Sequence, residues 1–272
     1  MATVIQFNDG PPEDDTPPFD YGAAPKAQAP RIELVRFTVM ELLADIEPEK
    51  WLLPGVPAEA YTLIAGGLSS YKTTLLLYLG ACKATGWDIL GLDEHGAGID
   101  VGKFVLATYE DTVGRMKAKW QRVIQHGHQH IAERWGKQDA DMFAARAAAN
   151  FLLVPCSGKL DSGIVRRIDG GLIVRNNDFL LPLVDAVRDF APEGVLIGLD
   201  PLRLAIAGSQ NDDDGADIAV HTLNALATAI PGSGVIVCSH STKAGAQEPG
   251  NRLHGRGLRH IRFGTLQPAR AQ

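Results

Sequence analysis

Cysteine is scarce in this chain of 272 residues, and its placement excludes a disulfide or zinc framework. The three cysteines lie far apart, each in an apolar segment, at Cys82, Cys156 and Cys238. A disulfide scaffold needs an even set of cysteines, and a zinc site needs pairs of ligands at short spacings. We therefore expect all three to be small buried side chains.

Long hydrophobic runs are also lacking. Apolar stretches such as 74–82 and 151–154 fall far short of the ~20 residues that a membrane-spanning helix needs. The acidic N-terminus lacks the positive start of a secretory signal peptide. Hydrophobic residues at 45% and charged residues at 21% exclude wholesale disorder, coiled coil and collagen. We expect a globular, cytoplasmic protein with no membrane partner.

Charge and proline are spread unevenly along the chain, whose net charge is -6. Residues 1–30 contain five acids, one lysine and six of the sixteen prolines, a composition that cannot bury enough apolar surface to fold. Residues 251–272 contain five arginines and no acid. We expect a disordered acidic tail over 1–30, one folded domain over 31–257 and a basic tail over 258–272. The basic end either contacts phosphates or is a solvated terminus of no specific role.

Short apolar runs alternate with longer helical stretches between these tails, which is typical of parallel strands joined by crossover helices. Four runs are expected to be strands, over 61–65, 103–108, 194–199 and 234–239. The predicted fold class is α/β, with a mostly parallel, doubly wound sheet. Because such sheets bind ligands at the carboxyl ends of their strands, the residues that follow each run are the candidate site.

The first predicted strand leads into a glycine-rich loop and an apolar helix over 74–84. Gly66 and the pair Lys72 and Thr73 have the spacing of a phosphate-binding loop. Backbone N–H groups of such a loop approach a polyphosphate, the lysine reaches its β and γ phosphates, and the threonine hydroxyl can ligate Mg²⁺. The alternative is a glycine-rich turn that happens to hold a lysine and a threonine. The predicted ATP-binding residues are Gly66, Gly67, Leu68, Ser69, Ser70, Tyr71, Lys72, Thr73 and Thr74.

Tyr71 departs from this pattern, which has glycine before the lysine. If the backbone there needs a positive φ, a tyrosine costs on the order of 1 kcal/mol. If φ is negative, the ring can point outward at little cost.

Acidic side chains follow the second and third predicted strands. Glu110 is a candidate base that polarises water for attack on the γ phosphate, with Asp111 as the N-cap of the next helix. The alternative is that both acids only cap that helix, over 112–126. Asp200 fits a second Mg²⁺ anchor, or it is an aspartate that starts a loop before a proline.

His240 follows the fourth predicted strand. It either senses the γ phosphate or is an ordinary loop histidine. Each of the four strand ends carries the residue type that nucleotide hydrolysis requires, and chance agreement at all four is far rarer than at one. The functional interpretation is therefore favoured.

In combination these elements resemble the RecA-like P-loop ATPases, and within them the RepA-like replicative helicases of plasmids and phages, an AAA-family group. The resemblance covers about 51–257. Beyond the loop, it depends on Trp51-Leu52-Leu53-Pro54-Gly55, Thr85-Gly86-Trp87, Tyr109-Glu110-Asp111, Leu199-Asp200-Pro201-Leu202 and His240-Ser241-Thr242-Lys243.

The resemblance implies Lys72 and Thr73 on phosphate and Mg²⁺, Asp200 at the metal, Glu110 as the catalytic carboxylate and His240 as the γ-phosphate sensor. It also implies that Arg256 stabilises the transition state of a neighbouring subunit, in a homo-oligomer that forms a hexameric ring. Single-stranded DNA is the partner that the resemblance suggests. The net acidity, and the lack of an interleaved basic and aromatic surface, give DNA binding little direct support.

The predicted function is Mg²⁺-dependent hydrolysis of ATP to ADP and phosphate, in a DNA helicase or a motor of replication or recombination. Two departures favour an alternative, a nucleotide-binding regulatory or assembly module with little or no turnover. One is Tyr71. The other is the segment 258–272, which lacks the further strands of the family and is expected to be truncated or divergent.

Two other segments are less specific. His126 and His130 have metal-ligand spacing on a helix, but Gly127 argues against a firm helix, and no further ligand completes a site. We expect a solvated, histidine-rich turn that also includes His128. The alternation over 164–176 predicts a hairpin.

Overall fold

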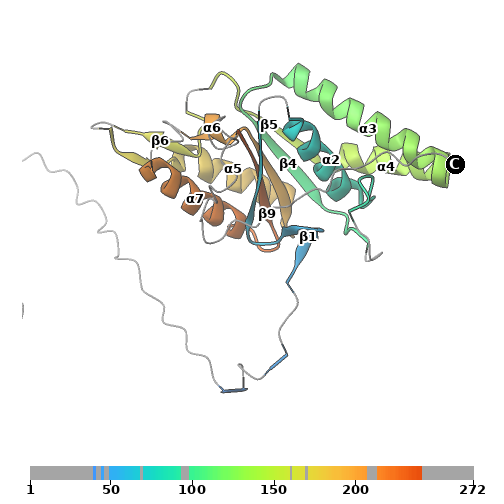
Figure 1. Ribbon diagram of the computed structural model, residues 1–272, viewed down its shortest axis with the longest axis horizontal. Coiled ribbons are helices and arrows are strands. Elements are labelled where there is room, and N and C mark those ends of the chain that lie inside the picture. The colour runs from blue at the N-terminus through green and yellow to red at the C-terminus, as the bar shows by residue number, and fades with distance from the viewer. Residues whose placement is uncertain are drawn as a thin grey trace, which may run out of the picture. The chain divides into compact units, whose positions relative to one another are not determined.

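A parallel β-sheet carries the described part of the chain, with strand order β3-β9-β8-β4-β5 (Figure 1). The computed structural model describes residues 39–40, 44–45, 49–67, 70–92, 98–159, 161–168, 171–206 and 213–240. The elements discussed below lie in the unit Pro48–Gln272. All four pairings within the sheet are parallel, which confirms the α/β fold class. The strands are β3 (Tyr61–Gly66), β4 (Lys103–Thr108), β5 (Phe151–Pro155), β8 (Val195–Asp200) and β9 (Gly234–His240).

Helices cover both faces of this sheet, as a doubly wound fold requires. Figure 1 shows α2, α3 and α4 on one side of the strands and α5 and α7 on the other. The predicted helix over 74–84 forms as α2, with a few more residues at its ends. The described helices are α2 (Lys72–Thr85), α3 (Val113–Trp135), α4 (Lys137–Ala149), α5 (Asn177–Phe190), the short α6 (Leu202–Ala205) and α7 (Asp213–Thr228).

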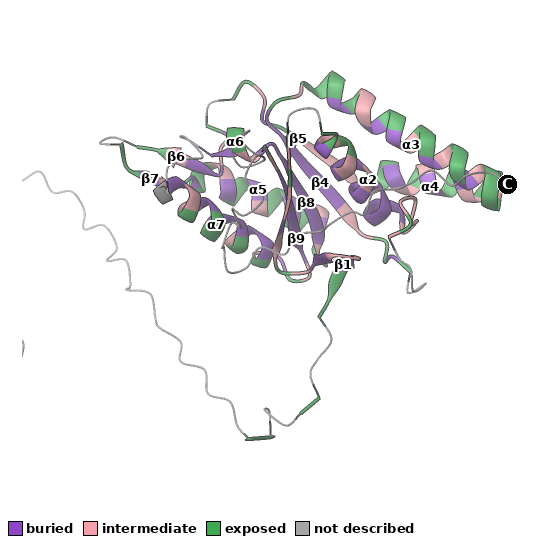
Figure 2. Ribbon diagram, in the orientation of Figure 1, coloured by how far each residue is buried: buried purple, intermediate pink, exposed green. Residues whose placement is uncertain are grey.

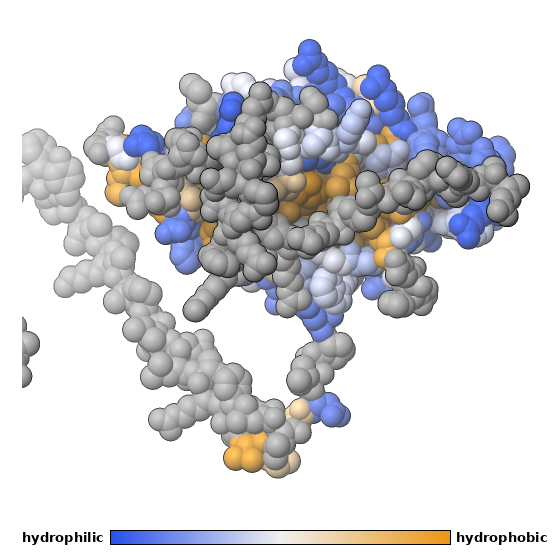
Figure 3. All heavy atoms as spheres, in the orientation of Figure 1, coloured by the Kyte–Doolittle hydropathy of each residue, from blue (hydrophilic) through white to orange (hydrophobic). Residues whose placement is uncertain are grey.

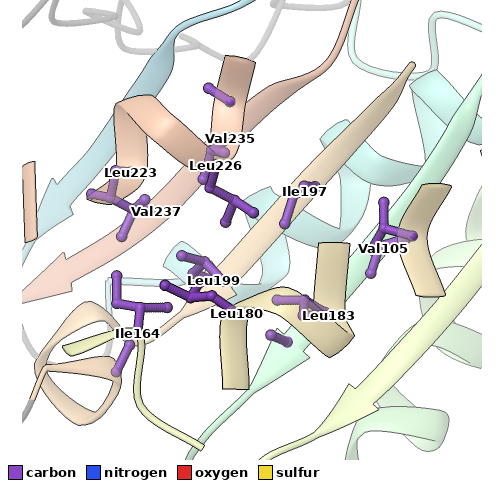
Figure 4. Packing of buried hydrophobic residues seen from close by; sticks show 14 of the residues in the cluster. Val105, Ile164, Leu180, Leu183, Ile197, Leu199, Leu223, Leu226, Val235 and Val237 are labelled. Atoms are coloured by element: carbon purple, nitrogen blue, oxygen red, sulfur yellow. The ribbon is translucent and has the colours of Figure 1, made fainter. Parts of the chain in front are cut away.

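In each central strand, alternate side chains pack into two different hydrophobic cores, one on each face of the sheet. Val105, Ile197 and Val237 pack with α5 and α7 in the cluster of Figure 4, whereas Phe104 and Leu196 pack with α2 and α3. The central strands are therefore buried on both faces, as the purple ribbons of Figure 2 show. This is why they read as continuous apolar runs in the sequence. It also leaves only the two edges formed by the strand ends open to ligands.

Two antiparallel pairs accompany the sheet. β1 (Trp51–Leu53) pairs with β2 (Val56–Pro57), close to the amino ends of the central strands. β6 (Val165–Arg167) pairs with β7 (Ile173–Arg175), which confirms the hairpin predicted over 164–176.

The three cysteines are buried and free, as predicted. Burial raises the pKa of Cys82 to about 12, so this thiol stays protonated. None of the described helices is both long and apolar enough to cross a membrane. The acidic segment 1–30 and the basic segment 258–272 lie outside the described residues.

The histidine-rich turn is a wrong prediction, because His126, His128 and His130 all lie within α3. Gly127 does not break this helix. A Cβ at this position would lie 2.5 Å from Cζ of Phe143 on α4. Glycine is needed for the close approach of the two helices. Within the described segments, no cluster of three potential metal ligands forms, so no such metal site involves these histidines there.

One face of α3 packs inward and the other is polar. Its buried residues recur at spacings of three and four, as Met116, Trp120, Val123, Gly127 and Ile131. Figure 3 shows hydrophilic side chains over the region of α3 that faces outward. This division is the amphipathic pattern of a helix that covers a sheet.

We expect Gly127→Ala to lower the free energy of unfolding by about 1–3 kcal/mol, because the added methyl group overlaps the Phe143 ring. Urea denaturation measures the change. Gly114→Ala is the matched control on the same helix, since nothing lies within 4 Å of the added Cβ. Equal effects at both positions would contradict the packing role of Gly127.

Candidate nucleotide site

The predicted phosphate loop connects the carboxyl end of β3 to the first turn of α2. Lys72 is the first residue of α2, and its ammonium group folds back over the loop. Its Nζ donates to the carbonyl oxygens of Gly66 at 2.9 Å and Gly67 at 2.7 Å, and to Oγ of Ser70 at 3.1 Å. The lysine is thus held where a phosphate bound in the loop would lie.

Gly66, at the start of this loop, lies close to the Ser70 side chain. A Cβ on Gly66 would lie 2.6 Å from Oγ of Ser70, so a larger residue would displace the serine. The first turn of α2 contains no acidic residue. The N–H groups and positive dipole end of α2 are therefore available to an anion. Thr74 lies exposed in that first turn, while Leu68 and Ser69 are outside the described residues.

Tyr71 takes the left-handed backbone conformation, with φ 57° and ψ 22°, and its side chain is 81% exposed. Of the two conformations considered from the sequence, the one with positive φ is therefore present. The ring nevertheless points into solvent and does not fill the loop. Tyrosine here costs backbone strain without blocking a ligand.

Thr73 and Asp200 meet at this edge of the sheet. The Thr73 hydroxyl lies close enough to the Asp200 carboxylate to lower the pKa of that group. The two residues come from different elements, since Thr73 is in the first turn of α2 and Asp200 is the last residue of β8. The two predicted Mg²⁺ ligands are thus adjacent in space although far apart in sequence.

Asp200 is almost fully buried, with 7% of its surface exposed. Burial raises the pKa of its carboxyl group, while the nearby Thr73 hydroxyl, the charge of Lys119 and the Cys238 thiol oppose that rise. The nearby Asp111 adds to it. A buried carboxylate with too little positive charge around it is suited to bind a cation.

Thr108 supplies a second observation that fits a metal or its water shell. It is the register partner of Asp200 on the neighbouring strand β4. Its hydroxyl oxygen is buried and has no hydrogen-bond partner among the described residues. Hydroxyl and carboxylate oxygens are the donors that Mg²⁺ prefers, directly or through water. The residues present at this edge therefore fit a magnesium ion.

Glu110 lies just beyond the end of β4 and is exposed. The preceding residue, Tyr109, donates its backbone N–H to the carbonyl oxygen of Asp200 at 2.9 Å. The chain that bears Glu110 is thereby fixed to the end of the Asp200 strand. Its carboxylate is on the same edge as the loop and open to water.

The cap predicted for the next helix is wrong by one residue. Thr112, not Asp111, is the N-cap of α3, and its hydroxyl accepts from the N–H of Arg115 at 3.4 Å. Asp111 instead forms an ion pair with Lys119, which projects from α3 toward Asp200. Sequence reasoning missed Lys119, because no motif marks a lysine whose role arises from the packing of α3 on the sheet.

The backbone places His240 beside the loop. His240 ends β9 and is the register partner of Gly66 in the parallel pair of β3 and β9. Its side chain is outside what the structure describes, and Arg256 lies outside the described residues altogether. Lys72, Thr73, Glu110 and Asp200 are thus brought to one edge, with the backbone of His240 among them.

We expect Tyr71→Gly to raise the free energy of unfolding by about 1 kcal/mol, because glycine adopts positive φ without strain. Tyr71→Ala is the matched control, since it removes the exposed ring but keeps the Cβ that causes the strain. Urea denaturation compares the two. If alanine stabilises as much as glycine, the ring and not the backbone is responsible.

Asp200→Asn should raise Tm by a few degrees at neutral pH in the absence of nucleotide. The raised pKa means that the ionised carboxylate lowers the free energy of unfolding at neutral pH. This penalty vanishes below the ordinary pKa of aspartate, where folded and unfolded chains are both protonated. The gain should therefore shrink as the pH falls toward that range in thermal unfolding. Glu110→Gln, at an exposed carboxylate of the same edge, should change Tm little at either pH.

Comparison with known proteins identifies the family of the chain. A family model described as an AAA domain matches residues 28–246, well over half of the chain. Among solved structures, a DnaB-like replicative helicase, described with its interactions with primase, has a TM-score of 0.44 at 16% identity. That match covers 74% of this chain and 43% of the helicase, so the chain spans less than half of that protein.

A second solved structure, a KaiC-like protein from the archaeon Pyrococcus horikoshii, has a TM-score of 0.38 at 14% identity and covers 71% of this chain and 72% of its own. No curated protein matches the sequence. The match of the family model extends over the loop, the sheet and the residues at its carboxyl edge. The chain therefore belongs to the AAA domain family, as the resemblance of its motifs led us to expect.

Proposed function

We propose that this protein is a Mg²⁺-dependent ATPase that hydrolyses ATP to ADP and phosphate at the carboxyl edge of its sheet. The observation that carries the proposal is the close approach of the Thr73 hydroxyl to the buried carboxylate of Asp200, next to the loop that holds Lys72. A loop lysine, a helix-start hydroxyl and a strand-end carboxylate are the three groups that position a triphosphate and its metal in P-loop enzymes.

Lys72 would bind the β and γ phosphates by exchanging partners. Its ammonium group now donates to two carbonyl oxygens and one hydroxyl of the loop. A phosphate oxygen is a stronger, charged acceptor, so the exchange is favourable when nucleotide enters. The N–H groups at the start of α2 would bind the same phosphates from the other side.

Thr73 and Asp200 would hold the metal. Mg²⁺, when bound, offsets the negative charge that develops on the phosphate oxygens. The Thr73 hydroxyl is placed to ligate directly, and the Asp200 carboxylate to act directly or through water. Because burial disfavours the charged form of Asp200, a cation beside it would stabilise the ionised carboxylate.

Glu110 would act as the general base. An exposed carboxylate at the end of β4 can accept a proton from a water molecule that attacks the γ phosphate. Its placement beyond Asp200, on the adjacent strand, separates the base from the metal ligands. Water activation and phosphate binding would therefore depend on different strand ends.

We further propose a motor role on single-stranded DNA in a homo-oligomeric ring, as the family resemblance implies. In such a ring His240 would sense the γ phosphate, and Arg256 would reach the site of the neighbouring subunit. The backbone of His240 beside Gly66 supports the first of these roles.

A nucleotide-binding regulatory module is the second candidate. It is favoured by the strained Tyr71 and by the contacts that hold Lys72 against its own loop. If these contacts keep the loop in one conformation, nucleotide would change assembly without being turned over.

Lys72→Ala should weaken ATP binding on the order of 100-fold, because several charged hydrogen bonds to phosphate are lost. Glu110→Gln should leave ATP binding within about twofold and lower kcat by about 10²–10⁴-fold, because it removes only the base. Equilibrium binding of a fluorescent ATP analogue and phosphate release measure the two effects.

The same assay separates the two candidate functions. An enzyme shows Mg²⁺-dependent phosphate release in the unmodified chain, and a DNA motor releases phosphate faster when single-stranded DNA is added. Binding without release would instead support the regulatory module. Loss of ATP binding in both variants would contradict the separate roles of Lys72 and Glu110.

A further inference from the structure

A cavity of about 750 Å³ lies at the opposite edge of the sheet from the nucleotide site. Its walls come from β1, the last turn of α2, the end of α5 and the residues that lead into β4, β8 and β9. These are the amino ends of the central strands, at the end of the sheet where Figure 1 labels β1. The volume is within the range of about 300–1,000 Å³ that small-molecule sites occupy.

Lys83 lines this cavity from the last turn of α2 and is 7% exposed. Burial lowers the pKa of Lys83, and the charge of Asp100 only partly opposes this. An anion beside a lysine whose charged form is disfavoured by burial stabilises it, and such residues are found where a ligand completes the site.

The neighbouring backbone is shaped around this side chain. A Cβ on Gly102 would lie 2.5 Å from Cε and 3.2 Å from Nζ of Lys83, so a larger residue there would push the end of the lysine side chain aside. The N–H of Gly102 also donates to the carbonyl oxygen of Lys83 at 2.8 Å. Gly102 therefore packs directly against the end of the Lys83 side chain.

The rest of the cavity offers further positive charge and two aromatic rings. Lys50 and Lys103 also line it, and Nζ of Lys103 lies 4.8 Å from the ring centroid of Phe190. Trp51 is 45% exposed at the cavity. Asp100 and Glu193 are the acidic residues among the described lining residues, so lysines outnumber acids there.

We propose that this cavity is a second ligand site, for a small organic anion with a flat apolar body, whose acidic group pairs with Lys83 while the body packs against Trp51 and Phe190. The site is distinct from the nucleotide site, because Lys72 and Lys83 are at opposite ends of α2, roughly 16 Å apart along the helix. A carboxylate, sulfonate or phosphate group would satisfy the lysine equally.

The test uses 8-anilino-1-naphthalenesulfonate, a fluorescent aromatic anion, titrated into the full chain. Lys83→Met should raise its Kd about tenfold or more, because one buried charged contact is lost. Lys72→Met, the same substitution at the other end of the helix, should leave this Kd within about twofold while it weakens ATP binding on the order of 100-fold. ATP binding should be unchanged in Lys83→Met.

A neutral probe separates charge recognition from general apolar binding. N-phenyl-1-naphthylamine has the same aromatic body without the sulfonate, and Lys83→Met should change its affinity by less than about twofold. An equal loss of affinity for both probes would overturn the proposal, as would an unchanged affinity of the anion. A larger effect of Lys72→Met than of Lys83→Met on the anion would place it at the nucleotide loop and also overturn the proposal.

Gly102→Ala gives a second variant that keeps the charge. The added methyl group pushes the end of the Lys83 side chain out of its position, so the affinity for the anion should fall severalfold although the lysine remains. Circular dichroism verifies that the variants fold. If Gly102→Ala binds the anion as tightly as the unmodified chain, recognition of the anion does not depend on the position of the Lys83 side chain.

Discussion

The contact between Thr73 and Asp200 is the interaction on which the nucleotide site depends. Because β9 lies between β3 and β8, the loop after β3 carries the first turn of α2 across to the carboxyl end of β8, and α2 then crosses the face of the sheet toward the amino edge. The same crossing buries the apolar face of α2 against the sheet. Packing of the helix and assembly of the site are therefore one event, and a change in the position of α2 would separate the hydroxyl from the carboxylate.

Several residues of the site lower the stability of the fold when no ligand is bound. Asp200 is buried against its charge, Tyr71 holds a left-handed backbone, and the hydroxyl of Thr108 is buried without a partner among the described residues. Each feature costs stability in the absence of ligand, and each lies at one edge of the sheet. The two hydrophobic cores behind this edge consist of apolar side chains that alternate between the two faces of the sheet. Costs of this kind at a candidate site are expected where ligand binding offsets them.

Most of the sheet and the four strand ends could be predicted because buried parallel strands are apolar throughout and their polar ends stand out. The range of β4 was predicted without error, and the other predicted strands differ from the structure by a residue or two at their ends. β5 was not recognised as a strand, and the histidine segment was wrongly expected to be a turn. Those features depend on contacts between residues that are distant in sequence, such as Gly127 and Phe143. The local sequence pattern does not reveal such contacts.

The two edges of the sheet present opposite backbone groups of α2. Anion binding therefore depends on lysine side chains more at the amino edge than at the carboxyl edge. At the carboxyl edge, the start of α2 presents free N–H groups to an anion, with Lys72 as an addition. At the amino edge the same helix ends in carbonyl oxygens, which Gly102, Asn150 and Arg146 already occupy as donors. The negative end of the helix dipole would repel an anion there. A cavity at that edge can attract an anion only through side chains, and its lining supplies the lysines to do so.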